Sequence, residues 1–182
     1  MPTLSPALKK RLSIVARQMQ ALSIPTEGRA PNLKNAKNIF LIRSATPDLF
    51  KKAVRELKAM APNATLHVVS HERDRELIEN TCAPRAQFHA YTSGGNYSWE
   101  SLAPLIPSLT AVKLDTFVML ANNVYGYPHI AEILYKLGAK KLYLFNTNER
   151  WFTMTREELE FKTACAGVYQ SICNIFWEEA AR

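Results

Sequence analysis

The stretch NIFLIRSATPD, residues 38–48, decides the fold of this chain. It begins with four consecutive apolar residues, Ile39 to Ile42, which are typical of a buried strand in a parallel sheet. A short polar turn follows, and then Thr46 and Pro47, which suit the N-cap and the first position of a helix. Apolar residues spaced i, i+3, i+4 and i+7 from Phe50 continue the helical pattern. The stretch therefore predicts a strand that leads directly into a helix, as in a parallel α/β sheet.

A second stretch, TFVMLANNVYGYP at residues 116–128, repeats this order of strand, polar turn and helix start. The helix that follows has the same apolar spacing from Ile130, and Gly138 is placed to cap its C-terminus. In a doubly wound sheet, ligands bind in the crevice outside the carboxyl ends of the strands, at the point where the strand order reverses. We therefore expect the two polar turns to face each other across such a crevice.

Strands and helices alternate along the rest of the chain. Three further strands are predicted, so that the five expected strands are Ile39–Ile42, Thr65–Val69, Gln87–Tyr91, Thr116–Leu120 and Lys141–Phe145. The third is the weakest and is expected near a sheet edge. Thr155 and Glu158 form a capping box for a last helix that runs to about Glu179. The expected fold class is α/β: a doubly wound, mostly parallel, five-stranded Rossmann-like sheet with extra N- and C-terminal helices.

The expected domain organisation separates residues 1–37, an amphipathic helix and a linker, from residues 38–182, a single Rossmann-like domain with its C-terminal helix. The first helix has apolar residues at spacings of four, three, four and three, namely Leu8, Leu12, Val15, Met19 and Leu22. Such a helix either packs on its own domain or forms a basic arm on a membrane surface. The last helix has an apolar stripe that we expect to be buried on the sheet: Val168, Tyr169, Ile172, Ile175 and Phe176.

The composition is that of an ordinary globular protein with an excess of positive charge. The chain has 182 residues, of which 47% are hydrophobic and 21% charged, and its formal net charge is +7. This basic surface either favours anionic partners, such as phosphorylated ligands, anionic membranes or nucleic acid, or has no specific partner. The three cysteines form no CxxC pair, so neither a zinc site nor a disulfide framework is indicated. Because Met1 to Leu22 is no signal peptide and no apolar run of about 18 residues occurs, we expect a cytoplasmic protein, with peripheral membrane contact as an alternative.

The turn after the first strand offers four candidate site residues, Arg43, Ser44, Thr46 and Asp48. A helix N-terminus attracts anions, and the Arg43 guanidinium can hold a phosphate or carboxylate at two points. Asp48 is the candidate catalytic residue, as a general base for a substrate hydroxyl. The alternative is that Asp48 only stabilises the dipole of its own helix.

The turn after the fourth strand offers a second set of ligand-binding candidates, namely Asn122, Asn123, Tyr125, Gly126 and His129. Asparagine amides both donate and accept hydrogen bonds, which suits sugar hydroxyls. Gly126 permits close approach of a ligand, and His129 near a helix N-terminus suits phosphate binding or titration near neutral pH. The alternative for His129 is an ordinary surface histidine.

Several classes of protein are excluded by missing motifs. No GxGxxG follows the first strand, no GxxxxGK[ST] is present, and no GxSxG is present. These absences argue against a dinucleotide fingerprint, a P-loop enzyme and an α/β-hydrolase. The four histidines lack metal-ligand spacing, so we expect neither a metal nor a cofactor. Aromatic and basic residues do not alternate on a strand as in RNA-binding sheets, so nucleic acid is not the expected partner.

A family resemblance lies in the run NIFLIRSATPDLFKKAVRELKAMAPNATLHVV, residues 38–69. It resembles the amino-terminal, acceptor-side half of heptosyltransferase-like bacterial glycosyltransferases of the two-Rossmann-domain type. The positions that match the family pattern are Ile42-Arg43, Ser44-Ala45, Asp48, Leu57, Pro62 and Ala64. The run VYGYPHIAEILYKLGAKKLYLFN, residues 124–146, is similar to the segment between strands four and five of such half-domains.

The resemblance implies a role in bacterial surface-polysaccharide biosynthesis, with a sugar or phosphorylated ligand in the crevice and Asp48 as the base that activates the acceptor. The chain departs from the family in three ways: Pro47 replaces a glycine, the turn is slightly shorter, and the second Rossmann domain, which binds the nucleotide sugar, is absent. We therefore expect a domain that is not catalytic alone. The alternative is a non-enzymatic interaction module, or a subunit that assembles with a partner chain or with itself.

Overall fold

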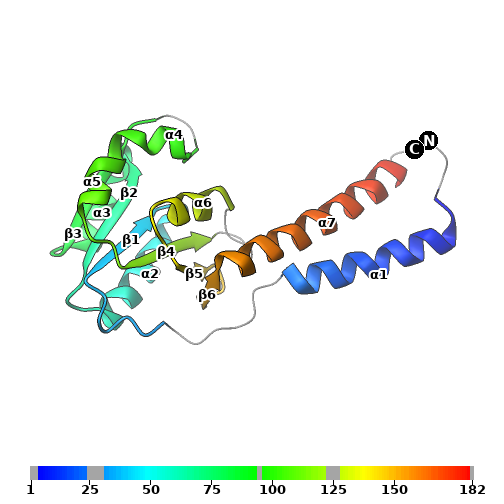
Figure 1. Ribbon diagram of the computed structural model, residues 1–182, viewed down its shortest axis with the longest axis horizontal. Coiled ribbons are helices and arrows are strands. Elements are labelled where there is room, and N and C mark those ends of the chain that lie inside the picture. The colour runs from blue at the N-terminus through cyan, green and yellow to red at the C-terminus, as the bar shows by residue number, and fades with distance from the viewer. Residues whose placement is uncertain (1–3, 24–30, 94–95, 122–127, 181–182) are drawn as a thin grey trace. The chain divides into compact units, whose positions relative to one another are not determined.

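The computed structural model describes residues 4–23, 31–93, 96–121 and 128–180 (Figure 1). The chain divides into two compact units. Residues 27–156 form one, which we call the sheet unit, and residues 1–26 with 157–182 form the other, which we call the helix pair. The expected boundary at residue 37 kept the C-terminal helix with the sheet, whereas the observed division groups that helix with the N-terminal one.

Strands and helices alternate through the sheet unit, as expected from the sequence. The strands are β1 (Asn38–Ile42), β2 (Thr65–His71), β3 (Ala86–Tyr91), β4 (Thr116–Ala121), β5 (Lys141–Asn146) and β6 (Trp151–Thr155). The helices are α2 (Pro47–Met60), η1 (Glu72–Asp74), α3 (Arg75–Cys82), α4 (Trp99–Leu102), η2 (Ala103–Leu105), α5 (Ile106–Ala111) and α6 (Pro128–Lys136). The helix pair consists of α1 (Pro6–Ser23) and α7 (Arg156–Ala180).

The strand order is β3-β2-β1-β4-β5-β6, so the chain moves outward in both directions from the adjacent strands β1 and β4 (Figure 1). Strand β1 is parallel to both β2 and β4, and β4 is parallel to β5. This is the doubly wound, Rossmann-like order, with its switch point between β1 and β4. The expected fold class is confirmed, and β3 lies at a sheet edge as predicted.

Within the described residues the sheet has six strands, and the expectation of five was wrong. Residues Trp151–Thr155 form β6, which runs antiparallel to β5. In the connecting turn, Asn146 Oδ1 accepts hydrogen bonds from the backbone N–H groups of Asn148 and Arg150, at 3.0 and 3.3 Å. Glu149 takes a left-handed conformation with φ 58°. Glycine or asparagine usually marks such a turn in a sequence, so a glutamate at this position conceals the hairpin.

The core of the sheet unit lies against the two central strands. Residues Ile39 to Ile42 of β1 have no exposed surface, and all six residues of β4 are buried. Helix α2 covers the sheet with Leu49, Phe50, Ala53, Val54 and Leu57. This near-continuous apolar character is what a parallel strand requires when both of its faces are covered. Because both strands are buried and paired with each other, their carboxyl ends lie side by side at one edge of the sheet.

Two histidines form a hydrogen-bonded chain across β1, β2 and β3. His67 Nε2 lies 3.3 Å from Asn38 Oδ1, and His67 Nδ1 lies 3.3 Å from His89 Nε2. Asn38 Nδ2 donates to the carbonyl of Lys113 at 3.1 Å, so the amide oxygen of Asn38 is the atom that faces His67. With His67 neutral, His67 donates from Nε2 and accepts at Nδ1 from the Nε2–H of His89, so protonation of His67 would remove this acceptor.

We expect the free energy of unfolding to decrease as the pH falls below about 6.5. Burial lowers the pKa of His67, and burial together with the charge of His67 lowers the pKa of His89. The unfolded chain therefore takes up protons at a higher pH than the folded one. The stabilising contribution is complete above the unfolded pKa and is lost as the pH falls toward the folded pKa values.

Urea denaturation between about pH 7.5 and pH 5.5 measures this dependence. The double variant His67→Gln, His89→Gln is the control, and its stability should vary less over the same interval. Equal pH dependence of the wild type and the double variant would show that the histidine chain does not carry the effect.

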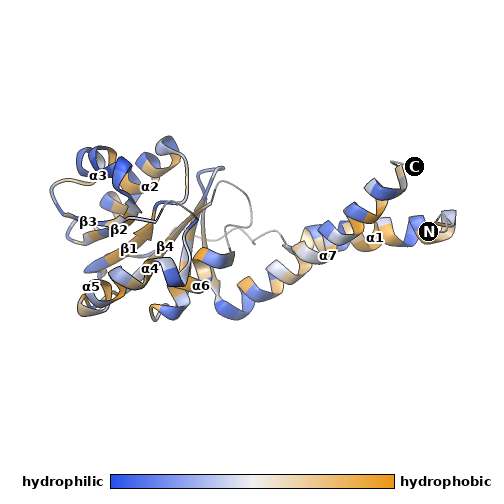
Figure 2. Ribbon diagram, turned by 90° about the horizontal axis from the view of Figure 1, so that it is seen from above, coloured by the Kyte–Doolittle hydropathy of each residue, from blue (hydrophilic) through white to orange (hydrophobic). Residues whose placement is uncertain are grey.

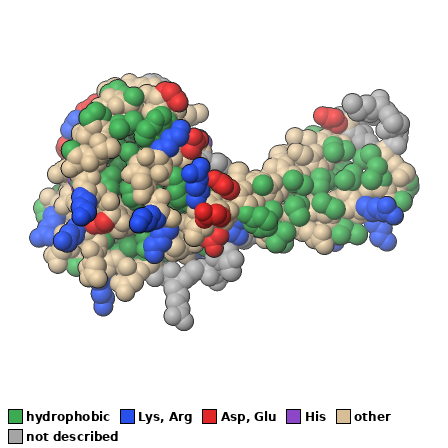
Figure 3. Space-filling model, in the orientation of Figure 1, with side chains coloured by type: hydrophobic (Ala, Val, Ile, Leu, Met, Phe, Trp, Pro, Cys, Tyr) green, Lys and Arg blue, Asp and Glu red, His purple; other side chains and the backbone are tan. Residues whose placement is uncertain are grey.

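The helix pair is antiparallel: α1 and α7 run beside each other in Figure 1 and overlap in the view of Figure 2, which is turned by 90°. The end of α1 lies near the start of α7, where Lys162 Nζ donates to the carbonyl of Leu22 at 3.4 Å. On the side of the pair that faces the viewer in Figure 3, hydrophobic side chains gather over both helices. Among the described residues, no helix has the length and apolar character needed to cross a bilayer.

Candidate functional site

The candidate site lies where β1 and β4 end, at the carboxyl edge of the sheet. The two strands are direct neighbours, with Ile42 opposite Met119. Ser44, in the turn after β1, donates from Oγ to the carbonyl of Leu120 in β4 at 2.7 Å. This bond ties the first polar turn to the end of the neighbouring strand. The edge between β1 and β4 is the place where doubly wound folds bind ligands.

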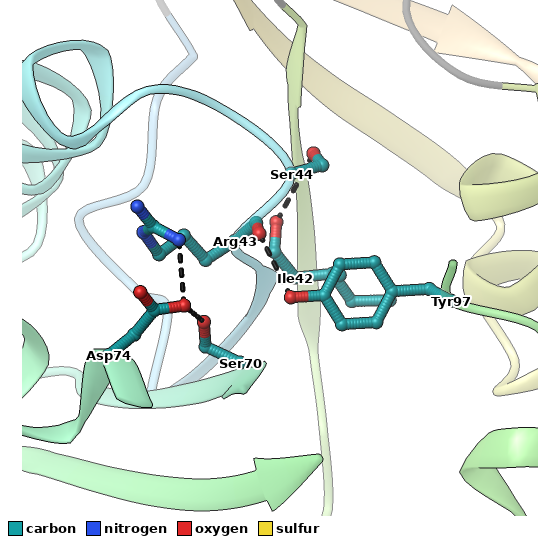
Figure 4. Close-up of polar contacts among 6 residues, drawn as sticks. All are labelled: Ile42, Arg43, Ser44, Ser70, Asp74 and Tyr97. Carbon is teal, nitrogen blue, oxygen red and sulfur yellow. Dashed lines mark hydrogen bonds and ion pairs between the residues drawn. The ribbon is translucent and has the colours of Figure 1, made fainter. Parts of the chain in front are cut away.

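Arg43 is held beside the site by an ion pair with Asp74 (Figure 4). Arg43 Nη1 donates to Asp74 Oδ2 at 2.7 Å, and the two side chains are each only 13% exposed. The same oxygen accepts a hydrogen bond from Ser70 Oγ at 2.6 Å. Arg43 Nε is buried and has no hydrogen-bond partner among the described residues. Arg43 therefore joins the first turn to η1, and its charge is already paired within the protein.

Tyr97, in the segment that precedes α4, lies at the same edge of the sheet as Arg43. Its hydroxyl donates to the carbonyl of Arg43 at 3.1 Å, as Figure 4 shows. The ring lies among two others, with centroid distances of 4.8 Å to Tyr91 and 5.4 Å to His71. Burial raises the pKa of Tyr97, so the hydroxyl remains a phenol and a hydrogen-bond donor at neutral pH.

A pocket of about 290 Å³ opens at this edge of the sheet unit. Its lining brings together the turn after β1, the segment before α4 and the first turn of α6, through Ser44, Asn96, Tyr97, His129 and Ile130. Its volume lies near the lower limit of small-molecule sites. The N-terminus of α6 adds backbone N–H groups that suit an anion. The pocket therefore offers hydroxyl, amide and imidazole groups for a small polar ligand.

The structure brings two of the predicted site residues, Ser44 and His129, into one pocket. Arg43 does not line it and pairs with Asp74 instead. Thr46 is the exposed N-cap of α2, and Asp48 is exposed in the first turn of that helix. The four remaining predicted residues, Asn122, Asn123, Tyr125 and Gly126, lie outside the described residues.

Sequence reasoning missed four residues at this edge: Ser70, Asp74, Asn96 and Tyr97. Asp74 lies in the charged run HERDRE, residues 71–76, which matches none of the motifs considered above. Asn96 and Tyr97 precede Ser98, which caps α4 in a reciprocal pair with Ser101. The Ser-x-x-Ser spacing was a signal for that helix start, and it would have placed Tyr97 at the entry to the helix.

A second concavity, which we call the basic groove, lies between α2 and α3 and has a volume of about 710 Å³. Its charged lining residues are Lys51, Arg55, Lys58, Arg73 and Glu76. Lys58 Nζ already donates to the carbonyls of two residues at the end of α3, at 2.9 and 2.7 Å. The groove is thus a local concentration of the positive charge seen in the composition. Within the described part of the chain, no group of three His, Cys, Asp or Glu side chains is arranged to hold a metal ion.

Comparisons with known proteins do not assign the chain to a family. No family model and no curated protein matches it. Among solved structures, it is similar to the trans-2-enoyl-CoA reductase of Clostridium acetobutylicum in complex with NAD, at 13% identity and a TM-score of 0.35. The match covers 98% of this chain and 51% of the reductase chain, so the protein spans about half the length of that structure. A similarity this low carries no argument about ligand or activity.

Proposed function

We propose that the sheet unit binds a small sugar or sugar phosphate in the pocket between β1 and β4. The observation that carries the proposal is that Ser44, in the turn after β1, and His129, in the first turn of α6, line one pocket with Asn96 and Tyr97. Together with the sequence resemblance described above, this supports the acceptor side of a glycosyltransferase-like protein of bacterial surface-polysaccharide biosynthesis as the broader role.

The hydrogen bonds inside the protein favour a ligand with hydroxyl groups. Ser44 Oγ gives its proton to the carbonyl of Leu120, and the Tyr97 hydroxyl gives its proton to the carbonyl of Arg43. Both oxygens therefore keep lone pairs that accept hydrogen bonds but have no proton left to donate. A sugar supplies the missing donors through its hydroxyl groups.

The part of the pocket that α6 contributes favours an anion. His129 is the second residue of α6, and helix N-termini bind phosphate through free N–H groups and the helix dipole. A sugar phosphate supplies a partner for both sets of groups, with its hydroxyls near Ser44 and Tyr97 and its phosphate near His129. We assign no catalysis to the isolated chain, because Asp48, the candidate base, is exposed and does not line the pocket.

Thermal-shift measurements with inorganic phosphate, a free monosaccharide, a sugar phosphate and a nucleotide sugar test the proposal. We expect the sugar phosphate to raise the melting temperature more than either fragment does, because a ligand that binds only the folded state stabilises it. In titration calorimetry, Ser44→Ala and His129→Ala should each weaken binding by about tenfold, as expected for the loss of one hydrogen bond.

Asp48→Asn is the matched control, because it changes an exposed polar residue of the same turn. It should leave ligand affinity unchanged and cost about 0.3–1 kcal/mol of stability through the lost interaction with the dipole of α2. Two results would contradict the proposal. One is the absence of a shift with any of the four compounds. The other is binding that is lost in Lys51→Ala, Arg55→Ala but retained in Ser44→Ala, which would move the anion site to the basic groove.

A further inference from the structure

Each helix of the pair turns one line of buried and half-buried residues toward the other helix. On α1 this line comprises Lys9, Leu12, Ala16, Met19 and Ser23. On α7 it comprises Lys162, Cys165, Tyr169, Ile172 and Phe176. Both lines follow spacings of three, four, three and four residues, which is the heptad pattern of helices packed along their length.

A second line of apolar residues on each helix is left uncovered. On α1 it consists of Leu8, Val15 and Leu22, and on α7 it consists of Phe161, Val168 and Ile175. These six side chains are 38% to 55% exposed, and within each helix they recur every seven residues. We call them the exposed rows. A strict period of seven keeps both rows in line with the buried seam, as in helices that pack on more than one neighbour.

The two exposed rows lie on the same flank of the pair. Every residue of the rows directly precedes a seam residue, as Val15 precedes Ala16 and Val168 precedes Tyr169. Because the helices are antiparallel, equivalent positions in the two helices fall on the same side of the seam. Figure 3 shows one side of the pair, on which hydrophobic side chains lie over both helices. The other flank includes the exposed residues Gln20 and Gln170, and also Trp177, which is 77% exposed.

We propose that this flank is the contact surface of a homodimer, in which two helix pairs stack through their exposed rows to form an antiparallel four-helix bundle. The pair by itself buries few side chains: on α1, for example, only Ala16 and Ser23 are buried. Helices of this kind gain most of their stability from tertiary packing of an apolar face. A second copy supplies an identical apolar face, as a two-fold interface requires, and four-helix bundles are built in this way.

The charges of α1 and α7 favour a second copy of the chain as the partner, and they also favour one orientation of that copy. Helix α1 carries four basic residues and no acidic one, whereas α7 carries five glutamates and two basic residues. A two-fold axis parallel to the helices places α1 of one copy on α7 of the other, so opposite charges meet along the bundle. The alternative axis would place α1 on α1 and bring like charges together, which is unfavourable.

The same features disfavour a membrane as the occupant of this flank. A helix that lies on a bilayer has a broad apolar face with lysine and arginine along its polar face. Here Ile14 and Trp177 add exposed apolar surface outside the rows, so it is the charge that counts against a membrane: the glutamates at both ends of α7 would lie near anionic headgroups. The seven-residue period matches packing against helices and has no role at a lipid surface.

Sedimentation velocity of the full chain tests the proposal directly. At about 50 μM the wild type should sediment as a dimer, with twice the 20.6 kDa mass of one chain, and should dissociate on dilution. The variant Val15→Glu, Val168→Glu places unpaired charges in the centre of the contact. It should weaken dimerisation by at least about a hundredfold and sediment as a monomer.

The matched control is Gln20→Glu, Gln170→Glu, which adds the same charge outside the exposed rows and should remain dimeric. Circular dichroism establishes whether each variant keeps its helices. If the glutamate variant loses them, the milder Val15→Ser, Val168→Ser should still show a weaker dimer. A monomeric wild type at about 50 μM would overturn the proposal, and so would equal weakening by the control. Wild-type monomer that cosediments with phosphatidylserine vesicles would identify a membrane as the occupant instead.

Discussion

Asp74→Ala is expected to destabilise the sheet unit by about 3 kcal/mol. The substitution removes the carboxylate that pairs with Arg43, whose side chain is largely buried. It also leaves Ser70 Oγ without its acceptor, and Ser70 has no exposed surface. Losing one partner of a buried ion pair leaves an uncompensated charge, which costs more than the pair contributed. The remaining 13% exposure places the estimate at the lower end of the usual range of about 3–5 kcal/mol.

Urea denaturation of three variants separates the ion pair from simple loss of packing. In the double variant Arg43→Met, Asp74→Leu, both charges are replaced by apolar groups of similar size. It should recover most of the stability that Asp74→Ala loses. Asp74→Asn keeps the shape and one acceptor oxygen and should fall between the two. A loss below about 1 kcal/mol for Asp74→Ala would mean that water reaches the Arg43 guanidinium when the carboxylate is absent.

Phe50→Ala is expected to cost about 3–5 kcal/mol, the largest loss among the substitutions considered. Phe50 has no exposed surface and is one of the largest side chains in the core between α2 and the central strands. Its removal takes away the transfer free energy of an aromatic ring and leaves a cavity that close-packed neighbours fill only in part. A loss of this size is a large fraction of the stability of a typical domain.

The neighbouring substitution Lys51→Ala is the control, because Lys51 lies on the exposed face of the same helix. It should change the free energy of unfolding by less than about 0.5 kcal/mol. Both variants can be compared by urea denaturation at neutral pH, with the slope of the transition checked for two-state behaviour. A Phe50→Ala loss no greater than that of Lys51→Ala would place the core of the unit elsewhere.

The regular elements of the sheet unit could be predicted from the sequence because their signals are local. Four consecutive apolar residues predicted β1, and a stripe at i, i+3, i+4 and i+7 predicted α2. The sixth strand could not be found in this way, since Glu149 adopts a conformation that its residue type rarely signals. The surrounding hairpin holds Glu149 in that conformation through hydrogen bonds of Asn146 to later backbone groups.

The location of the candidate site could be predicted from the sequence, but only some of its residues could. Strand polarity and the doubly wound order bring the turns after β1 and β4 to one edge, which is why Ser44 and His129 could be named from the sequence. Arg43 was expected to bind a ligand. Its guanidinium instead forms an ion pair with Asp74, which is 31 residues away in the chain. Tyr97 reaches Arg43 across 54 residues through a backbone carbonyl, a contact for which no sequence pattern exists.

The sequence by itself determined which segments become strands and helices, and on which edge of the sheet their turns meet. The same periodicity named the apolar stripe of α1, from Leu8 to Leu22. Only the tertiary structure decided which of those residues are covered: Leu12 and Met19 are half-buried, while Leu8, Val15 and Leu22 stay exposed. The physical reason is that periodicity depends on residues within two turns of one another. Ion pairs, hydrogen-bond partners and covered faces depend on chain segments that come together only when the whole protein folds.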